Sequence, residues 1–357
     1  MVATIGAMAR RTLIWHLGLA DAPRAVVGAN LQAHAATLEG LGRPVVATAE
    51  EARLATHDLL RTHADAGLAR SAVDGWWARV CDRVWAHKGV SLLSTPDLCV
   101  ADKDQVRLAL DPLIGMEVHL VVTADSVSQQ LYGGWLAELR RGRTTGWDTY
   151  VGRVLADRPE HRQAEQFQSG HDLAALLARW GWTFHADRLH VLAQREPEAQ
   201  WRGLLDVAGL GDAEADRMPA LVPAYADPAG VAVLRRVNRH LDQPLPAGSS
   251  DLLARDDREP DAMPVVDTSR LAPLVGRWSA AFADAGHDVR GDLASLLDVG
   301  GATTLPGPRD QLGVAVDALA DALAENAHLR ERVGRVEAER DALDRKRRKW
   351  KRRAQQD

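Results

Sequence analysis

The chain has 357 residues, enough for two or three structural units, and its 46% hydrophobic and 26% charged residues are an ordinary globular mixture. The formal net charge of −5 argues against a nucleic-acid-binding protein with a broadly basic surface. Two cysteines exclude a disulfide-stapled scaffold, and no apolar run approaches the roughly 20 residues that cross a bilayer. The first eleven residues carry two arginines without a following apolar stretch, so we expect no signal peptide and a cytoplasmic protein.

Short apolar runs alternate with helical patterns through the first two thirds of the chain, which predicts a parallel α/β sheet flanked by helices. Strands are expected over 12–17, 90–94, 118–123 and 189–192. Helices are expected over 26–41, 49–63, 72–87, 103–114, 127–141 and 171–181. After about residue 215 the pattern predicts only helices, over 228–242 and 270–286, and no further strand.

The C-terminal tail differs from the rest of the chain. Apolar residues follow a 4-3-4 spacing over 312–323 and resume in a shifted phase over 329–343, which predicts a coiled-coil helix with a register break near Asn326. Residues 346–353 carry seven positive charges and no acid. Removing these seven charges from the net −5 leaves −12 for the remainder of the chain.

The patterns divide the chain into four parts. Residues 1–215 form the predicted α/β domain, 216–300 a helical extension packed on it, 301–308 a Gly/Pro linker, and 309–357 the coiled-coil helix. We expect 309–344 to join a second copy of the chain or another protein. Three interpretations of 346–353 stay open: a solvated helix end, a segment that docks on an anionic membrane surface with Trp350 as anchor, or a segment that binds an acidic partner.

Several segments resemble one family in the same order along the chain. They are LIWHLG at 13–18, EVHLVVT at 117–123, LRRVN at 234–238 and GHDVRGDL at 286–293. These segments are similar to those of the actinobacterial sulfotransferases, and the resemblance covers about residues 11–298. It implies a P-loop-like α/β fold and transfer of a sulfuryl group from 3′-phosphoadenosine 5′-phosphosulfate.

The family's donor-binding loop reads G-T-P-K-T-G-T-T and cradles the phosphosulfate with backbone N–H groups and a lysine. In this chain the loop begins at Gly18, Asp21 stands at the lysine position, and Pro23 stands at the glycine position without an N–H to donate. Two unit charges 4 Å apart interact by roughly 4 kcal/mol at an effective dielectric constant near 20, so Asp21 turns attraction for the donor into repulsion. Arg24 could supply a replacement positive charge, although a solvated surface arginine is the commoner interpretation.

The family's second landmark, which binds the 3′-phosphate, is altered at two positions. Asp125 stands where the resemblance places an arginine for the 3′-phosphate, and Gly133 stands where many members have a serine. Ser126 and Ser128 lie nearby, but serines that open a helix are more often N-caps.

The third landmark is the acid after the strand at 90–94, a candidate base for the acceptor hydroxyl. In strict register this position is Pro96; Asp97, one residue later, could serve as the base or could simply favour the start of a helix.

The sequence offers no substitute chemistry. It has no H-E-x-x-H and no paired-cysteine spacing, so we predict no metal site. His119 and His190 fall within predicted strands and are expected to be satisfied there. Cys81 and Cys99 are expected to be small buried apolar residues.

We therefore expect a sulfotransferase-like protein that has lost donor binding and catalysis, with no cofactor, and that acts as a non-catalytic binding or scaffold protein through its tail. The alternative is an active sulfotransferase with a rearranged donor site built from Arg24, Asp97 and one of Arg140, Arg141 or Arg143; only this alternative needs the phosphosulfate donor. A third interpretation is a module that binds another ligand in the old cleft.

Overall fold

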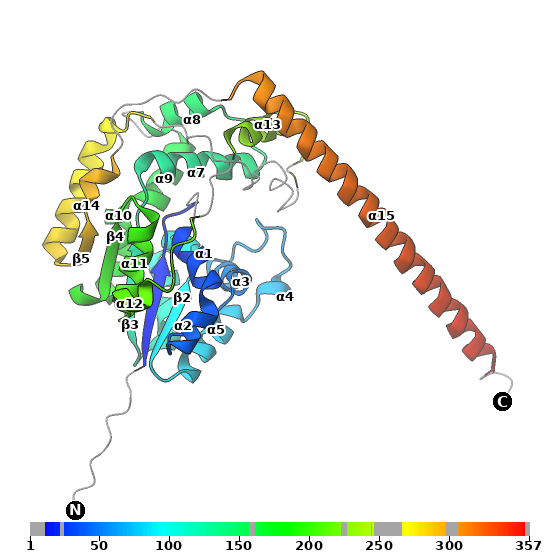
Figure 1. Ribbon diagram of the computed structural model, residues 1–357, viewed down its shortest axis with the longest axis horizontal. Helices are drawn as coiled ribbons and strands as arrows, with labels where there is room; N and C mark the ends of the chain where they lie inside the picture. The colour runs from blue at the N-terminus through cyan, green and yellow to red at the C-terminus, as the bar shows by residue number, and fades with distance from the viewer. Residues whose placement is uncertain are drawn as a thin grey trace, which may run out of the picture.

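In a computed structural model of the protein, five parallel strands form one sheet that the helices surround (Figure 1). The structure describes residues 11–21, 25–156, 161–222, 227–243, 245, 266–297 and 306–353, with side chains described as far as 348. The strands are β1 (Thr12–Leu17), β2 (Val90–Ser94), β3 (Glu117–Thr123), β4 (Leu189–Ala193) and β5 (Asp288–Gly291). Their order across the sheet is β2-β1-β3-β4-β5.

The helices connect and cover these strands. In chain order they are α1 (Val26–Ala33), α2 (Ala35–Gly40), α3 (Ala49–Leu60), α4 (Arg70–Val73), α5 (Trp76–Ala86), α6 (Lys103–Leu110), α7 (Val127–Arg140), α8 (Trp147–Val154), α9 (Arg162–His171), α10 (Leu173–Trp180), α11 (Pro197–Val207), α12 (Asp212–Ala215), α13 (Pro228–Asn238), α14 (Ala272–Ala285) and α15 (Pro308–Arg353). Short 3₁₀ turns are η1 (Pro96–Val100), η2 (Asp111–Leu113), η3 (Gly181–Thr183), η4 (Ala186–Arg188), η6 (Ser269–Leu271) and η7 (Leu293–Leu296).

The central strands are buried on both faces, which explains why their sequences are nearly continuous apolar runs. In β1, Trp15 pairs with Leu93 of β2 and with Leu120 of β3, and all three side chains are fully or almost fully buried. The four strands predicted from the sequence are confirmed, and so is the α/β class.

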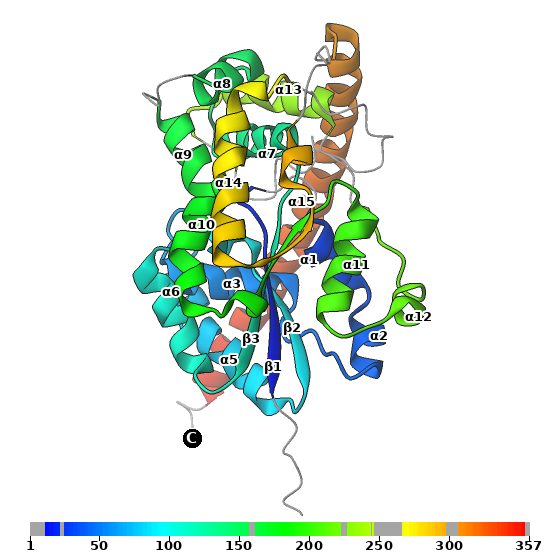
Figure 2. The ribbon, with the colours of Figure 1, turned by 90° about the vertical axis from the view of Figure 1, so that its left-hand side faces the viewer.

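Helices cover both faces of the sheet, as Figure 2 shows with the strands seen nearly edge-on. One face packs against α3, α5, α6, α10 and α14. The other face packs against α1, α2, α11 and α12. A separate apolar cluster joins α7, α8, α9 and α13. This third layer lies above the edge at which the strands end, here named the carboxyl edge.

The prediction that no strand follows residue 215 is wrong, because β5 pairs with β4. This strand has only four residues, carries the charged Asp288 and Arg290, and lies at the outer edge of the sheet. Edge strands are commonly short and charged, and such a strand has no apolar run that sequence patterning could detect.

Two predicted helices are divided in the structure. The helix expected over 26–41 is interrupted at His34, which separates α1 from α2. The helix expected over 72–87 is interrupted before α5 by Gly75, whose φ of 77° is a left-handed conformation that glycine adopts without strain.

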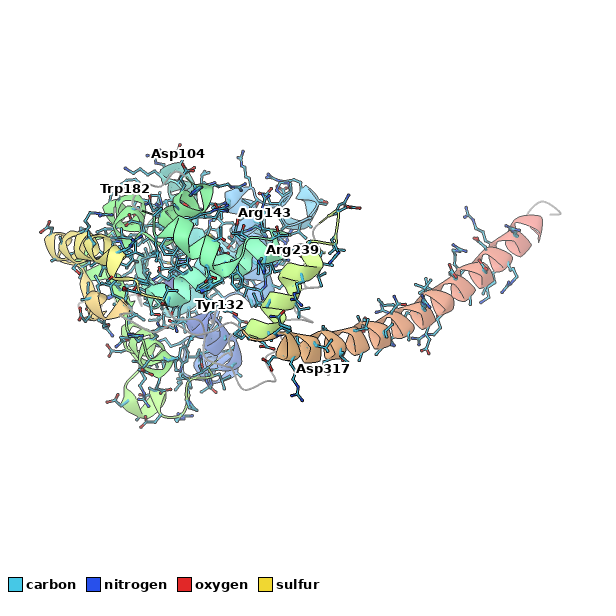
Figure 3. The ribbon with its side chains drawn as sticks, turned by 90° about the horizontal axis from the view of Figure 1, so that it is seen from above. Asp104, Tyr132, Arg143, Trp182, Arg239 and Asp317 are labelled. Carbon is cyan, nitrogen blue, oxygen red and sulfur yellow. The ribbon has the colours of Figure 1, made fainter. Side chains whose placement is uncertain are left out.

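The C-terminal helix α15 is one continuous helix that passes through Asn326 without interruption. Its first turns pack against α13 through the buried Val314 and Ala318. Beyond these turns, in which Figure 3 labels Asp317, the helix projects away from the sheet and its covering helices (Figures 1 and 3). The predicted linker is described only from Pro306 onward, because 301–305 lie outside the described residues.

Among the described helices, none combines the length and the apolar character needed to cross a membrane.

Candidate functional site

A cavity of about 470 Å³ opens at the carboxyl edge of β1 and β2. Its walls come from the turn after β1, from η1 after β2, and from helices α3, α7, α8 and α9. The polar or aromatic lining residues are Asp21, Arg53, Thr56, His57, Thr62, Asp65, Asp97, Glu138, Arg141, Tyr150, Gln163, Gln166, Phe167, Ser169 and His171. Parallel α/β sheets bind ligands outside the carboxyl ends of their strands, near the point where the strand order reverses, which in this order lies between β1 and β3. We name this space the carboxyl-edge cavity.

The β1 turn, residues 18–21, is shaped by contacts within the protein. A Cβ added at Gly18 would lie 2.9 Å from Cβ of Pro96, so this glycine is required by the close approach of η1. The backbone N–H of Ala20 donates to the carbonyl of Gly170, at 3.2 Å, and is therefore committed within the protein. A loop that cradles phosphate presents such N–H groups to its ligand.

Asp21 occupies the position that the family resemblance gives to a lysine, and it lines the carboxyl-edge cavity. Its φ of 53° is an uncommon left-handed conformation for a residue other than glycine. A guanidinium nitrogen of Arg141 lies 3.4 Å from its carboxylate. Burial raises the pKa of Asp21, Arg141 opposes this rise, and the nearby charge of Asp97 adds to it.

Asp97, in the first turn of η1, faces the same cavity. Water reaches its side chain, yet the surrounding protein partly removes the carboxyl from solvent and raises its pKa. Arg141 opposes this rise, and so does His57 at the acidic pH at which its ring is protonated. Within the described part of the chain it makes no hydrogen bond or ion pair of its own. The two roles weighed for Asp97 are thus both compatible with its place: it starts a helical turn and it presents a carboxylate to the cavity.

The far wall of the cavity comes from α7 and α8. Glu138 is buried, and its carboxylate accepts a hydrogen bond from the Gln163 amide at 3.4 Å. Tyr150 lies against Gly134, where an added Cβ would collide with the tyrosine hydroxyl. Burial raises the pKa of Tyr150, and the charges of Asp21 and Glu138 raise it further, so the phenol stays protonated.

Two histidines of the wall are neutral near pH 7. His57 lies close to Thr62, with 2.9 Å between its Nδ1 and the hydroxyl oxygen, and burial lowers its pKa. His171 stacks on Phe167 with 4.5 Å between ring centres, and burial lowers its pKa to about 3. Its Nδ1 has no partner among the described residues. Neither ring therefore adds positive charge to the cavity.

His16, the histidine of the LIWHLG segment, joins three strand ends. One ring nitrogen lies 2.8 Å from the hydroxyl of Ser94 on β2, and the other lies 3.0 Å from the hydroxyl of Thr123 on β3. Burial lowers its pKa to about 3, so the ring is neutral. This residue holds the carboxyl edge together and does not line the cavity.

Asp125, at the position that the resemblance gives to an arginine, is hydrogen-bonded within the protein. The Asp125 carboxylate accepts a hydrogen bond from the Gln200 amide at 3.2 Å, and its carbonyl accepts one from Gln130. Ser126 is the N-cap of α7, as predicted, because its hydroxyl accepts from the N–H of Gln129. Gly133 is buried within α7. Pro23 and Arg24 lie outside the described residues, so their predicted roles stay predictions.

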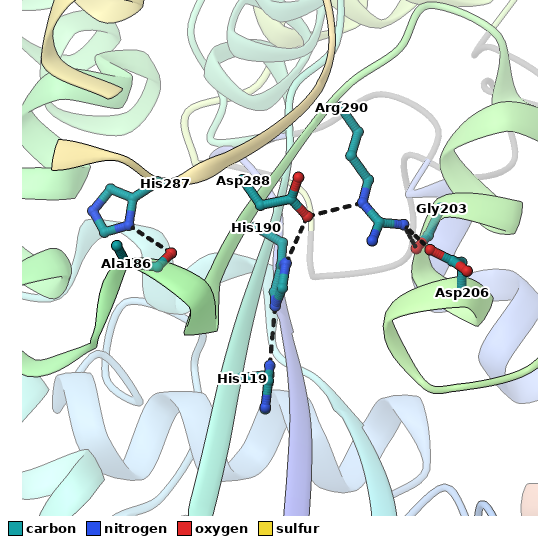
Figure 4. Close-up of polar contacts among 8 residues, drawn as sticks. All are labelled: His119, Ala186, His190, Gly203, Asp206, His287, Asp288 and Arg290. Atoms are coloured by element: carbon teal, nitrogen blue, oxygen red, sulfur yellow. Dashed lines mark hydrogen bonds and ion pairs between the residues drawn. The ribbon is translucent and has the colours of Figure 1, made fainter. Parts of the chain in front are cut away.

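The predicted sheet histidines are satisfied, as Figure 4 shows. Nδ1 of His119 lies 3.0 Å from Nε2 of His190, and the other nitrogen of His190 lies 2.9 Å from the Asp288 carboxylate. Arg290 donates to the same carboxylate and to Asp206, which extends the chain of contacts to α11. This network crosses β3, β4 and β5 and is separate from the carboxyl-edge cavity.

The cysteines are small buried residues, as predicted. Cys81 and Cys99 are 3% and 0% exposed. Burial raises the pKa of Cys81 to about 12 and raises that of Cys99 as well, so neither is a thiolate near pH 7. Within the described ranges, no three His, Cys, Asp or Glu side chains gather closely enough to hold a metal ion.

The balance of charge decides what the cavity can accept. Four acids face it, Asp21, Asp65, Asp97 and Glu138, against two arginines. Of the arginines, Arg53 is bound through two hydrogen bonds to Glu50, and Arg141 faces Asp21. The cavity thus favours a ligand with positive charge or hydrogen-bond donors over a polyanion.

Sequence patterning found Asp21 and Asp97 because both follow strand ends. It missed Glu138, Tyr150, His57 and His171. One signal for Glu138 was present: it lies three residues after Trp135 on the apolar stripe of the helix predicted over 127–141, where an acid is unusual. The other three reach the cavity only through the packing of α3, α8 and α9.

Comparison of the chain with protein-family models, with curated proteins and with solved structures gives no match.

Proposed function

We propose that this chain is a sulfotransferase-like protein that has lost its sulfuryl donor and acts as a non-catalytic binding protein. Its carboxyl-edge cavity would hold a small molecule that is cationic or rich in hydrogen-bond donors, and its contacts with other proteins would run through α15. The observation that carries this proposal is the Asp21 carboxylate in the β1 turn, where a phosphosulfate would need positive charge.

Two features of the fold support the sulfotransferase-like part of the proposal. The sheet is parallel throughout, and α1 is the next described element after β1, in keeping with the strand–loop–helix unit of P-loop-like proteins. The segments LIWHLG and EVHLVVT, quoted above for the resemblance, lie in the adjacent strands β1 and β3.

Three features support loss of the donor. Asp21 would repel an anion, the N–H of Ala20 is committed to Gly170, and Asp125 stands at the position that the resemblance gives to an arginine for the 3′-phosphate. Two of the three bring negative charge toward a nucleotide that carries several negative charges itself. Substitution of one landmark could be compensated, whereas these three act in the same direction.

The second candidate, an active sulfotransferase with a rearranged donor site, is favoured by two observations. Arg141, one of the replacement cations considered from the sequence, lies 3.4 Å from Asp21 at the β1 turn. The first turn of α1 has no acid, and its N-cap position, Ala25, provides no side-chain cap. Uncapped N–H groups at a helix start favour an anion.

A thermal-shift titration with 3′-phosphoadenosine 5′-phosphate separates the two candidates. A ligand at 100 times its dissociation constant adds about 2.7 kcal/mol of stability. We expect no rise in melting temperature at millimolar nucleotide. A saturable rise that Arg141→Ala abolishes would contradict loss of the donor and support the second candidate.

The same assay with agmatine, a small guanidinium-bearing amine, tests the cavity. We expect a saturable rise in melting temperature that Asp97→Asn reduces at least threefold. The matched control is Asp82→Asn, which removes an exposed acid on α5 away from the cavity and should leave the rise unchanged. Absence of a rise with the unaltered protein would contradict the ligand class proposed here.

A further inference from the structure

The projecting part of α15 leaves large apolar side chains uncovered. Leu319, Leu323, Leu329, Val333, Val336 and Leu343 are between 45% and 65% exposed. Between residues 319 and 348, all described side chains are exposed except Asp321 and Ala342, which are half-buried. A helix that presents apolar residues along one stripe requires a partner for that stripe, because isolated helices are marginal in water.

A single heptad register runs through this part of the helix. With Leu319 at position a, the core positions a and d are Leu319, Ala322, Asn326, Leu329, Val333, Val336, Arg340 and Leu343. The change of phase expected near Asn326 is therefore unnecessary, because the small Ala322 fills the d position that the larger residues leave out. Four consecutive heptads are enough for a coiled coil.

Asn326 at an a position indicates how two such helices would meet. A single asparagine at a position a of a parallel dimer pairs with the same residue of the second helix and fixes the register and the number of strands. In an antiparallel pair, position a faces position d, so Asn326 would face an apolar residue. The asparagine thus favours a parallel, in-register partner with the same sequence.

The flanking charges favour the same partner. In a parallel pair, each g residue faces the e residue five positions later on the other helix. Glu325 then faces Arg330, and Arg332 faces Glu337, so both pairs are attractive and each occurs twice in a symmetric dimer. Glu339 faces Asp344, a repulsive pair, but the adjacent Arg340 at position a lies beside Glu339 of the other helix.

We propose that residues 319–343 of α15 form a parallel, two-stranded coiled coil with a second copy of this chain. The inference rests on the proposed function only in taking α15 as the contact element, and it does not involve the cavity. Both α/β bodies would lie at one end of the rod, and the two basic segments beginning at Lys346 would lie together at the other end.

The molar mass of the full chain in solution tests the proposal first. Light scattering coupled to size exclusion should give twice the 38.8 kDa of one chain at micromolar concentration. A mass of one chain, or of three or more chains, would overturn it. Because donor binding is measured separately with the nucleotide, failure here leaves the proposed cavity function untouched.

A matched pair of variants tests which positions of α15 lie between the two helices. Val336→Glu places a charge at a core d position, whereas Ala338→Glu places the same charge at an outward f position two residues away. Both residues are exposed in a single chain, so neither variant disturbs the body. We expect the first to lower dimer affinity at least 100-fold and the second to leave it within threefold. Equal effects would overturn the assigned register.

Charge exchange and crosslinking test the parallel arrangement. Glu325→Arg should weaken the dimer, and adding Arg330→Glu should restore it. Asn326→Cys should form an interchain disulfide under mild oxidation, because equivalent residues lie side by side in a parallel pair; the two native cysteines are buried. A dimer in which this cysteine does not crosslink, or in which the double exchange does not restore affinity, would contradict the parallel register.

Discussion

The α/β body and helix α15 handle their large apolar residues in opposite ways. In the body, Trp15, Trp180 and Trp278 are fully buried. In α15, eight leucines and valines are at least 45% exposed, and its buried apolar contacts with the described part of the body come from its first turns. The body therefore carries its own core, whereas most large apolar side chains of α15 are left exposed, which is why we propose a partner for this helix. Substitutions in each region distinguish these two cases.

Truncation of a large buried side chain in the body should cause the greatest loss in the free energy of unfolding. Trp15 stacks on Trp77 at 5.1 Å, meets Trp180 edge-on, and donates to the hydroxyl of Thr95. Trp15→Ala should lower the free energy of unfolding by about 3–5 kcal/mol, since it leaves a large cavity and an unpaired hydroxyl. Urea denaturation followed by far-UV circular dichroism measures this loss. A loss below about 1 kcal/mol would show that the body has no rigid core at this position.

Acid should weaken the body through its neutral buried histidines. His16 and His171 have pKa values of about 3 in the folded chain against about 6.5 when unfolded, so the unfolded chain binds more protons between these values. Stability is therefore lost as pH falls below about 6.5. Each histidine should lower the free energy of unfolding by about 2 kcal/mol at pH 5 relative to pH 7.

The variant His171→Phe isolates one of these sites, since phenylalanine keeps the stacking on Phe167. Between pH 6 and 4, its free energy of unfolding should depend on pH less steeply than that of the unaltered protein, by about 1.4 kcal/mol per pH unit. Urea titrations at several pH values measure the two slopes. Parallel curves would mean that His171 titrates normally in the folded chain.

Alanine substitution of two glycines in the layer above the carboxyl edge should change the free energy of unfolding in opposite directions. At Gly134 a Cβ would collide with the Tyr150 hydroxyl, so Gly134→Ala should cost about 1–3 kcal/mol. At Gly152, within α8, an added Cβ meets no atom within 4 Å, so Gly152→Ala should stabilise by roughly 0.5–1 kcal/mol. Equal changes in the urea midpoint for both variants would contradict the described packing of Tyr150 on α7.

The smallest effect on the body should come from α15. Leu329 is 45% exposed, and no part of the described body covers it. Leu329→Ala should change the unfolding free energy of the body by less than about 0.5 kcal/mol, while it weakens association through α15. A loss above about 1 kcal/mol, measured at a concentration where the chain is monomeric, would show that the helix packs back on the body.

Whether the sequence predicts a strand or helix correctly depends on the contacts that its residues make. Strands β1 to β4 were predicted because burial on both faces demands apolar runs. Strand β5 was missed because Asp288 and Arg290 interrupt its pattern at the edge of the sheet. The division before α5 depends on the left-handed conformation of Gly75, which a glycine permits but does not require.

The candidate site was predictable only in part. Asp21 and Asp97 follow strand ends, which parallel strands bring to a common edge, and both line the cavity. Tyr150 and His171 come from α8 and α9, whose positions depend on long-range packing against α7 and on the loops between them. Local patterns carry no information on such contacts.

Calorimetric titration of 3′-phosphoadenosine 5′-phosphate into the full-length protein measures directly whether the chain still binds the donor nucleotide. At low ionic strength, where attraction between the nucleotide and any positive site would be strongest, the acid-lined cavity and the engaged β1 turn should produce no saturable heat up to millimolar nucleotide. A one-site isotherm with a dissociation constant in the micromolar range would contradict the proposed loss of donor binding.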